Sequence, residues 1–311
     1  MPKSIVNLIR QLYKNLIIYV LSKRDPRISA NRSYSSKFGK KIDWNNPADL
    51  IEKIYWLEIY SDTSLWSICA DKFRMRQYVK SKGCGSLLPR NYGHWQKAED
   101  INYNILPNEF VLKTTNGCGQ VLIVKNKRKL NIKKTNATLN KWMKIKYGFT
   151  DAQIHYSRIR PCIIAEEYLI DKTNPEQSYL TDFKVWCFHG KPEFILVVYD
   201  RTNSGYKLST YDLKWNNTSN KTLKRGIHYG GDPIRQPATL KEMIKYASLL
   251  SEDFLEVRVD FYEIDGKLYL GELTFSTGYG YYTDDYYKYL GSKINLNKAK
   301  QVKNINKPVW H

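Results

Sequence analysis

Four polar residues on two apolar stretches give the clearest chemical signal in this sequence. Arg258 and Asp260 lie two apart in VRVDFY, and Glu272 and Thr274 lie two apart in LGELTF. Residues two apart on a strand share a face, and a turn at Asp265–Gly266 would pair the strands, so all four groups should converge. Two carboxylates there repel each other unless a cation lies between them, and hard oxygen ligands suit Mg²⁺. The guanidinium would then hold a transferred phosphoryl group. A surface hairpin of mixed charge is the alternative.

A second group of residues is typical of phosphate binding. Lys113 ends the apolar stretch FVLK, and a glycine-bearing turn follows at Asn116–Gly119. Glycines let backbone N–H groups approach phosphate oxygens, and the lysine adds a positive charge. Lys184 alternates with Phe183 and Val185, so it projects from the opposite face of a strand. The alternatives are a hairpin turn beside a surface lysine and an exposed sheet face.

The segment IIAEEYL predicts a strand, Ile163–Leu169, that ends in two carboxylates. Its backbone could bond the edge of an adenine, and a carboxylate could bond the ribose. Taken alone, the segment also fits any buried strand that reaches the surface.

The elements that must position these groups are predicted from periodicity and turn residues. Asn45 or Asn46 would cap the first helix, with Pro47 in its opening turn. Helices that precede strands, without regular βα alternation, predict an α+β chain rather than a doubly wound one. The predicted helices are 47–60, 70–83, 129–146 and 240–250; the predicted strands are 110–113, 121–124, 163–169, 183–188, 193–199, 257–262 and 268–273.

The composition excludes several classes of function. The chain has 311 residues and a net charge of +20, but its basic residues are dispersed, so nucleic acid binding is not favoured over anionic glycans, nucleotides or lipids. The five cysteines show no CxxC pair, which argues against a zinc site or a disulfide framework and favours a reducing cytoplasm. No histidine lies at metal-ligand spacing from another, so a zinc enzyme or a histidine-based nucleophile is not expected.

The N-terminal segment 1–24 predicts an amphipathic helix. Arg10 and Lys14 interrupt its apolar residues, so neither a membrane span nor a signal peptide is expected. Two interpretations stay open: a helix docked on the protein's own core, or a basic helix on the anionic inner face of the plasma membrane. The apolar residues at helical spacing are Ile5, Leu8, Ile9, Leu12, Leu16 and Tyr19.

In this order the motifs resemble the ATP-grasp superfamily, and more narrowly its TupA-like (teichuronopeptide biosynthesis) branch of bacterial surface-polysaccharide proteins. The resemblance runs from about Lys41 to about Gly280 and covers most of the chain. It implies a nucleotide held between two α+β lobes, with ATP and Mg²⁺ as cofactors. The segments that carry it are IDWNNPADLIEKIYWLEIY, ADKFRMRQYV, FVLKTTNGCG, IIAEEYL, DFKVWCFHGKPEFI and VRVDFYEIDGKLYLGELTFSTG.

The resemblance also implies roles for single residues. Lys72, on a helix after an acidic residue, and Lys113 would contact the phosphates, and Lys184 would face them. Asp260 and Glu272 would ligate Mg²⁺, with Arg258 at the γ-phosphate. Thr274 stands where many ATP-grasp enzymes carry asparagine, so it would be a weaker or water-mediated metal ligand. The flap over the phosphates would be Asn116, Gly117, Cys118 and Gly119, and the adenine hinge would be Glu166, Glu167, Tyr168 and Leu169.

Three regions and one reaction follow from the resemblance. Residues 1–100 would be a helical region leading into the core, 101–165 the small lobe with the flap, and 166–311 the large lobe with the metal site and a C-terminal lid. The reaction would join an amino acid or peptide amine to a uronic-acid carboxylate of a surface glycan through an acylphosphate. A glycosyltransferase that uses a nucleotide sugar is the alternative, and a non-catalytic basic scaffold is a third. The tyrosine-rich stretch 279–289 would either stack on sugar or pack as a lid.

Overall fold

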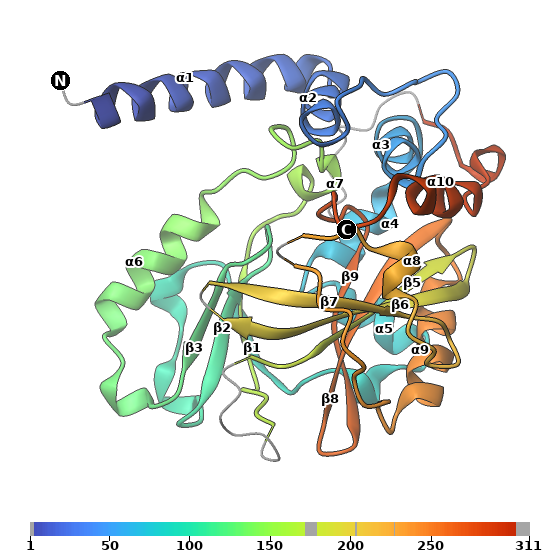
Figure 1. Cartoon of the computed structure of the whole chain (residues 1–311). Coiled ribbons are helices and arrows are strands. Elements are labelled where there is room, and N and C mark those ends of the chain that lie inside the picture. Colours follow the sequence, from blue (N-terminus) through green and yellow to red (C-terminus); the bar gives the residue numbers. More distant parts are fainter. Residues whose placement is uncertain (1–2, 172–178, 203, 227, 303–311) are drawn as a thin grey trace.

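The computed structural model describes residues 3–171, 179–202, 204–226 and 228–302, without the side chains of residues 3–6 and 8–12. In these residues two antiparallel sheets form the body of the molecule, and helices lie around them (Figure 1). The predicted α+β class is confirmed. The predicted large lobe, 166–311, also includes residues 172–178 and 303–311, which are not among the residues that the structure describes.

The smaller sheet has the strand order β1-β4-β2-β3. Its predicted hairpin is confirmed: β2 and β3 pair with Lys113 opposite Val121. Helix α6 (Ile132–Met143) covers the sheet and buries Leu139 against Phe110. One strand from the predicted first region, β1, joins this sheet by pairing with β4. The strands are β1 (Asn91–Trp95), β2 (Phe110–Thr114), β3 (Val121–Val124) and β4 (Ile163–Glu166).

The larger sheet has the order β7-β6-β5-β8-β9, with every neighbouring pair antiparallel. The turns predicted at His189–Gly190 and Asp265–Gly266 join β5 to β6 and β8 to β9. All four turn residues have positive φ, which glycine adopts without cost and which tightens the connection. The strands are β5 (Asp182–Phe188), β6 (Lys191–Thr202), β7 (Gly205–Tyr211), β8 (Glu256–Ile264) and β9 (Lys267–Thr274).

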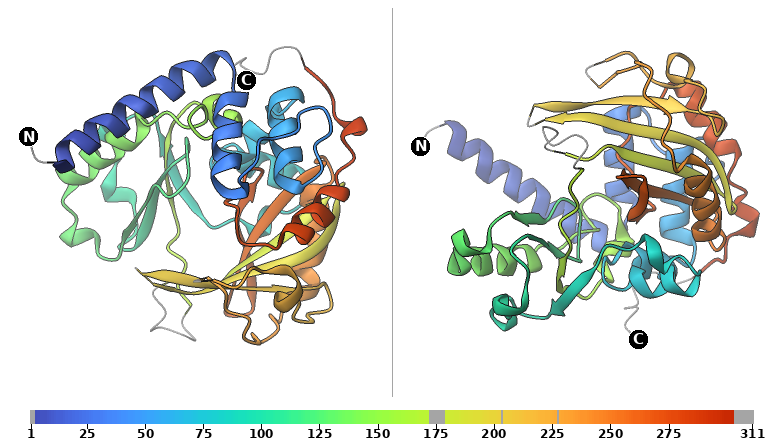
Figure 2. Two further views of the ribbon diagram at one scale, coloured as in Figure 1. Left: turned by 45° about the horizontal axis from the view of Figure 1, so that its top comes forward. Right: turned by 90° about the horizontal axis from the view of Figure 1, so that it is seen from below.

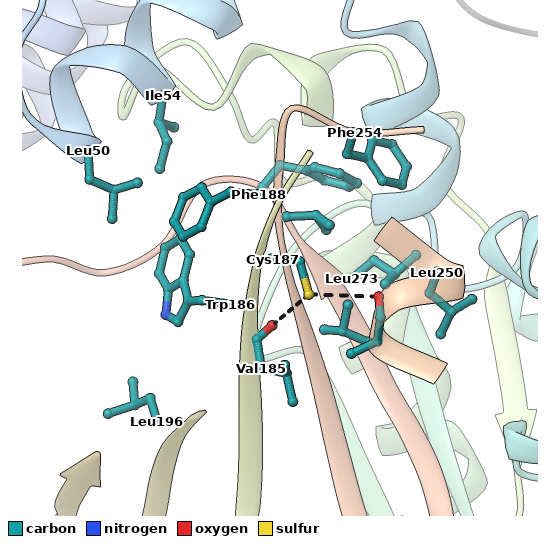
Figure 3. Packing of buried hydrophobic residues seen from close by; sticks show 14 of the residues in the cluster. Leu50, Ile54, Val185, Trp186, Cys187, Phe188, Leu196, Leu250, Phe254 and Leu273 are labelled. Atoms are coloured by element: carbon teal, nitrogen blue, oxygen red, sulfur yellow. Dashed lines mark hydrogen bonds between the residues drawn. The ribbon is translucent and has the colours of Figure 1, made fainter. Parts of the chain in front are cut away.

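Strand β5 runs through the main core. Figure 3 shows Trp186 and Cys187 of this strand between Leu50 of α3 and Leu250 of α9. All four side chains are buried, and the Cys187 Sγ lies 3.8 and 3.7 Å from the carbonyl oxygens of Val185 and Ala247, either of which can accept its one S–H. Lys184 alternates with the buried Phe183 and Val185 and is directed to the face opposite them, as predicted from the sequence. The core therefore fixes the strand that carries a candidate site residue.

The helical region begins with α1, which extends outward from α2 as a long arm (Figures 1 and 2). Ile17 and Leu21 of α1 are exposed, whereas Tyr19 packs edge-to-face on Phe149 with ring centroids 5.9 Å apart. The side chains predicted at Ile5, Leu8, Ile9 and Leu12 lie outside the described part. The helices are α1 (Lys3–Arg24), α2 (Arg27–Phe38), α3 (Leu50–Tyr60), α4 (Ser64–Ala70), α5 (Met75–Ser81), α7 (Ile154–Ser157), α8 (Ser219–Thr222), α9 (Leu240–Ser251) and α10 (Asp284–Ser292).

The cap predicted for the helix at 47–60 was wrong. Helix α3 begins at Leu50, and its cap is Asp49, which accepts hydrogen bonds from the backbone N–H groups of Ile51 and Glu52. The Glu52 side chain accepts in return from the Asp49 N–H and completes a capping box. The backbone N–H groups of the predicted caps, Asn45 and Asn46, instead donate to the Asp43 side chain.

The prediction of a single helix over 70–83 was also wrong in its first turn. The Asp71 carboxylate accepts from the N–H groups of Phe73 and Arg74 at 2.9 and 3.2 Å, and α5 begins only at Met75. Lys72 therefore lies on the turn between α4 and α5 and not on a helix. Such side chain to backbone bonds compete with regular helix, as expected for an aspartate.

Candidate functional site

A buried ion cluster lies on the larger sheet. Asp260 is only 1% exposed, and both of its oxygens accept from Arg258, each at 2.7 Å. Lys184, its neighbour across β5 and β8, donates to Asp260 Oδ2 at 2.6 Å. Burial alone would raise the pKa of Asp260, but the charges of Arg258 and Lys184 lower it below its usual value. The carboxylate is therefore held ionised inside the protein.

Arg258 extends the cluster toward β9 and the segment after it. Its guanidinium donates to Thr277 Oγ1 at 2.5 Å and to Thr274 Oγ1 at 3.2 Å. It also lies 3.8 Å from Glu272 Oε1. The convergence of Arg258, Asp260, Glu272 and Thr274 expected from the sequence is thus present, and Thr277 was missed because it lies beyond the paired strands.

The donor groups present fit a magnesium ion. Asp260 and Glu272 are direct partners across β8 and β9, and the Glu272 side chain is 40% exposed. A carboxylate offers about four acceptor positions, and the contacts of Asp260 with Arg258 and Lys184 use three of them. One remaining position on Asp260, the Glu272 oxygens and the Thr274 hydroxyl make a small set of hard ligands that leaves room for water and phosphate. Among the described residues no cluster of three His, Cys, Asp or Glu side chains forms a metal site.

The smaller sheet carries a second cluster around Glu166. Lys113 donates to Glu166 Oε2 at 2.7 Å, and Arg76 donates to Oε1 at 2.9 Å. Glu166 is buried at the end of β4, which pairs antiparallel with β2, so both cations are fixed at this end of β4. The sequence analysis did not select Arg76. Arg76 lies four residues after Lys72 in the predicted helix 70–83, and this helical spacing was the available signal.

The predicted glycine flap, Asn116–Gly119, is anchored at its base. The Asn116 amide donates to the carbonyl oxygens of Trp142 and Ile145 at 3.1 and 2.9 Å, and this side chain is buried. Gly117 lies against the Tyr147 ring so closely that an added Cβ would meet it at 2.1 Å. Gly119 has a φ of 75°, and Cys118 is exposed. Asn116 and Gly117 are thus held in place, and the next residues form the outer part of the flap.

Lys72 lies where the two clusters meet. Its ammonium donates to the Gly117 carbonyl oxygen at 2.5 Å. Burial lowers the pKa of Lys72, while the charge of Glu272 on the larger sheet raises it and the charge of Lys113 on the smaller sheet lowers it. A cation that both sheets influence, next to the glycine flap, is placed to bind a phosphate chain that runs between them.

The predicted adenine hinge follows the end of β4. The Glu167 N–H donates to the Arg90 carbonyl oxygen at 2.8 Å, and the Glu167 carboxylate accepts from the Arg90 N–H at 3.2 Å. These bonds use the Glu167 amide, so an adenine edge would have to use its carbonyl or the backbone of Tyr168 and Leu169. The hinge role of these residues stays a prediction.

A comparison with protein-family models matches residues 52–295 to the family described as TupA-like ATPgrasp. The chain belongs to this TupA-like ATP-grasp family. The match covers every residue predicted for the site, from Lys72 to Thr274, and the resemblance inferred from the motifs is confirmed.

Solved structures similar to this TupA-like ATP-grasp protein are themselves described as ligases or synthetases. D-alanine–D-alanine ligase from Bacillus anthracis, in complex with ATP, is 18% identical with a TM-score of 0.41, over 69% of this chain and 56% of that one. L-amino acid ligase from Bacillus licheniformis is 16% identical with a TM-score of 0.42, over 70% and 45%. N5-carboxyaminoimidazole ribonucleotide synthetase from Thermus thermophilus is 11% identical with a TM-score of 0.41, over 71% and 49%.

This chain spans about half of the length of these three structures. A comparison with curated proteins found no match.

Proposed function

We propose that this TupA-like ATP-grasp protein binds Mg·ATP between its two sheets and uses it to activate a carboxylate for attack by an amine. The observation that carries the proposal is the position of Lys72. Its ammonium donates to the Gly117 carbonyl oxygen, in the turn that follows β2 of the smaller sheet, and the charge of Glu272 on the larger sheet raises its pKa. Mg²⁺, held by Asp260, Glu272 and Thr274, would neutralise phosphate charge and orient the phosphoryl group.

The residues of the chain suit the two steps of such a reaction. In the first, a carboxylate oxygen attacks the γ-phosphorus, the bond to the β-phosphate oxygen breaks, and ADP leaves. Arg258 and Lys184 face the charge that develops on the transferred group. In the second, the amine nitrogen attacks the acyl carbon, and phosphate leaves with a proton from the amine. Closure of the flap Asn116–Gly119 would keep water from the acylphosphate.

We assign the substrates by the surface-polysaccharide context of the branch. The carboxylate would belong to a uronic acid of a bacterial capsule, O-antigen or teichuronic-type polymer, and the amine to an amino acid or peptide. The excess of basic residues, a net charge of +20, suits an anionic glycan. Assays that pair uronic acids with amines test this assignment by measuring ADP and phosphate. Release of a nucleoside diphosphate from a sugar donor, without ADP, would instead support the glycosyltransferase.

The N-terminal helix suggests that the enzyme works at the inner face of an anionic membrane. The sequence of α1 contains no acidic residue and ends in Lys23 and Arg24. Its exposed apolar side chains recur at helical spacing, so they form one stripe, and a stripe beside basic residues is typical of interfacial helices. Among the described residues no helix is both long and apolar enough to cross a bilayer. The exposed side chains of the stripe are Tyr13, Leu16, Ile17, Val20 and Leu21.

A further inference from the structure

Two adjoining cavities lie beside the buried ion cluster. The first, of about 370 Å³, lies between the β7 strand, residues 223–226 and 228–229, and the start of the tyrosine-rich stretch. The second, of about 170 Å³, reaches Lys184 and Arg258. Leu208 and Tyr281 line both cavities, so the two cavities adjoin at these side chains, and we call the pair the passage.

The passage carries cations at both ends. The inner cavity is lined by Lys184, Arg201 and Arg258, and the outer one by Lys37, Lys224 and Arg225. The described residues that line the two cavities include no aspartate or glutamate. At the inner end Lys184 and Arg258 pair with Asp260, and Arg201 pairs with Asp182, but neither carboxylate is among the lining residues. Cations therefore line both cavities, which suits a ligand with an acidic group at each end.

The outer cations differ in how far they are neutralised. The Lys224 ammonium pairs with the exposed Asp284 at 2.7 Å. Arg225 instead donates to the neutral amide oxygen of Asn220 at 3.0 Å and lies 4.0 Å over the Tyr229 ring. Within the described chain, Arg225 has no ion pair with a carboxylate. Its planar guanidinium therefore keeps donors for a ligand carboxylate, which it can bind through two hydrogen bonds.

The walls between the two ends are aromatic and ordered. Tyr206 stacks on His228 with ring centroids 4.1 Å apart, and its hydroxyl bonds that of Tyr281 at 2.8 Å. Tyr279 lines the outer cavity as well. By contrast, Tyr282 and Tyr287 of the same stretch are buried in the core. The tyrosine-rich stretch is thus divided between lining this passage and packing. Flat rings with fixed hydroxyls offer both a face and hydrogen bonds to a sugar ring.

We propose that this passage is the acceptor site and that it takes an acidic saccharide with at least two carboxylates. One carboxylate would lie at Lys184 and Arg258, where it can meet the γ-phosphate, and another would bind Arg225 and Lys37. The sugar rings between them would pack on Tyr281 and Tyr206. This assignment rests on the proposed ligase function, because the inner carboxylate is the one to be activated.

Calorimetric titration with digalacturonate, galacturonate and the neutral disaccharide lactose tests the site directly. We expect digalacturonate to bind the wild type at least tenfold more tightly than galacturonate, and lactose to bind more weakly than digalacturonate. Arg225→Gln should lower the affinity for digalacturonate about tenfold and leave that for galacturonate unchanged. Arg128 is exposed and lies just after β3 of the smaller sheet, so Arg128→Gln is the matched control. It should change the affinity for neither sugar. Mg·ATP titration of each variant verifies that it is folded.

Equal binding of the three sugars, or no binding of digalacturonate, would overturn the proposal. Displacement of digalacturonate by a non-hydrolysable Mg·ATP analogue would also overturn the proposal, because the reaction needs nucleotide and acceptor bound at the same time. Different results would refute the proposed site and the proposed ligase reaction. Tight digalacturonate binding without ADP release with any amine would refute the ligase reaction but not the site. ADP release from uronic acids that is insensitive to Arg225→Gln would refute the site but not the reaction.

Discussion

At the scale of single residues, Asp260 combines two tasks that conflict. It stabilises the buried Arg258 guanidinium, with both oxygens accepting at 2.7 Å, and in the proposed site it would offer its remaining acceptor position to Mg²⁺. A buried ion pair is expensive to break from one side, since the remaining charge stays desolvated. Glu272, which is 40% exposed, carries no such structural burden.

The two carboxylates should therefore respond differently to removal of their charge. We expect Asp260→Asn to lower the free energy of unfolding by about 3 kcal/mol, because Arg258 and Lys184 lose their partner. Glu272→Gln should cost less than about 1 kcal/mol, as for an exposed pair. Both variants should weaken the magnesium dependence of ATP binding. Urea unfolding and calorimetry with and without Mg²⁺ measure the two effects. An equal loss of stability in both variants would contradict the view that Asp260, and not Glu272, stabilises the buried cations.

Asp71 should make stability depend on pH. Burial raises its pKa from 3.8 to about 6, so between these values the folded protein binds more protons than the unfolded chain. Its contribution to stability is therefore largest below pH 4 and falls as the pH rises through 6, by about 3 kcal/mol in total. Asp71→Asn keeps a capping oxygen but does not titrate. The variant should thus gain stability over the wild type between pH 4 and 7 in urea unfolding. A difference that does not change with pH would refute this account.

The site residues were predictable from the sequence where chemistry and spacing coincide. Arg258, Asp260, Glu272 and Thr274 share one face because their spacing of two fixes it. Arg76 was not predictable in this way, because its partner Glu166 is distant in sequence and the contact depends on how α5 packs against the sheet end.

At the scale of elements, the glycine flap depends on one close contact. An added Cβ on Gly117 would meet the Tyr147 ring at 2.1 Å, so Gly117→Ala must displace the ring or the flap. We expect this variant to bind Mg·ATP about tenfold more weakly, which corresponds to about 1.4 kcal/mol. The second substitution Tyr147→Ala should restore most of the affinity by removing the obstacle.

The double variant separates this mechanism from a general defect. If Gly117→Ala weakens binding and Tyr147→Ala does not repair it, the contact with the ring is not the cause. Calorimetry of the wild type, both single variants and the double variant completes the cycle.

The helix α1 should bring the protein to anionic vesicles. We expect Leu16→Gln with Val20→Gln to reduce binding to vesicles that contain phosphatidylglycerol several-fold, since the apolar stripe inserts below the headgroups. Ile105→Gln with Ile132→Gln removes two exposed apolar side chains elsewhere and should have no effect. Vesicle sedimentation measures both. Equal binding by all proteins, or equal binding to neutral vesicles, would contradict the membrane role of α1.

The elements show where sequence patterns suffice and where they do not. Hairpins with glycine or Asp-Gly turns were predicted with correct partners, because turn geometry and alternation fix the register. The starts of α3 and α5 were misplaced because Asp49 and Asp71 bond backbone N–H groups locally. Several nearby polar residues could have made such bonds, and only the backbone geometry decides which of them does.

At the scale of the whole molecule, the two sheets have separate cores, one around Phe110 and Leu112 and one around Val185 and Trp186. The family and the α+β class followed from the order of the motifs, but the position of Lys72 between the clusters did not. It requires contacts across long stretches of the chain, such as the bond from Lys72 to the Gly117 carbonyl oxygen. A ligand that binds both sheets should therefore stabilise the protein as one unit.

Calorimetric titration of Mg·ATP into the wild type, Lys113→Ala and the control Lys127→Ala tests the central claim most directly. Lys113 lies in the proposed phosphate site, whereas Lys127 begins the short 3-10 helix Lys127–Lys129 beyond β3. The account predicts magnesium-dependent binding by the wild type and the control, weakened at least tenfold in Lys113→Ala. Absence of ATP binding by the wild type, or equal binding by all three proteins, would contradict it.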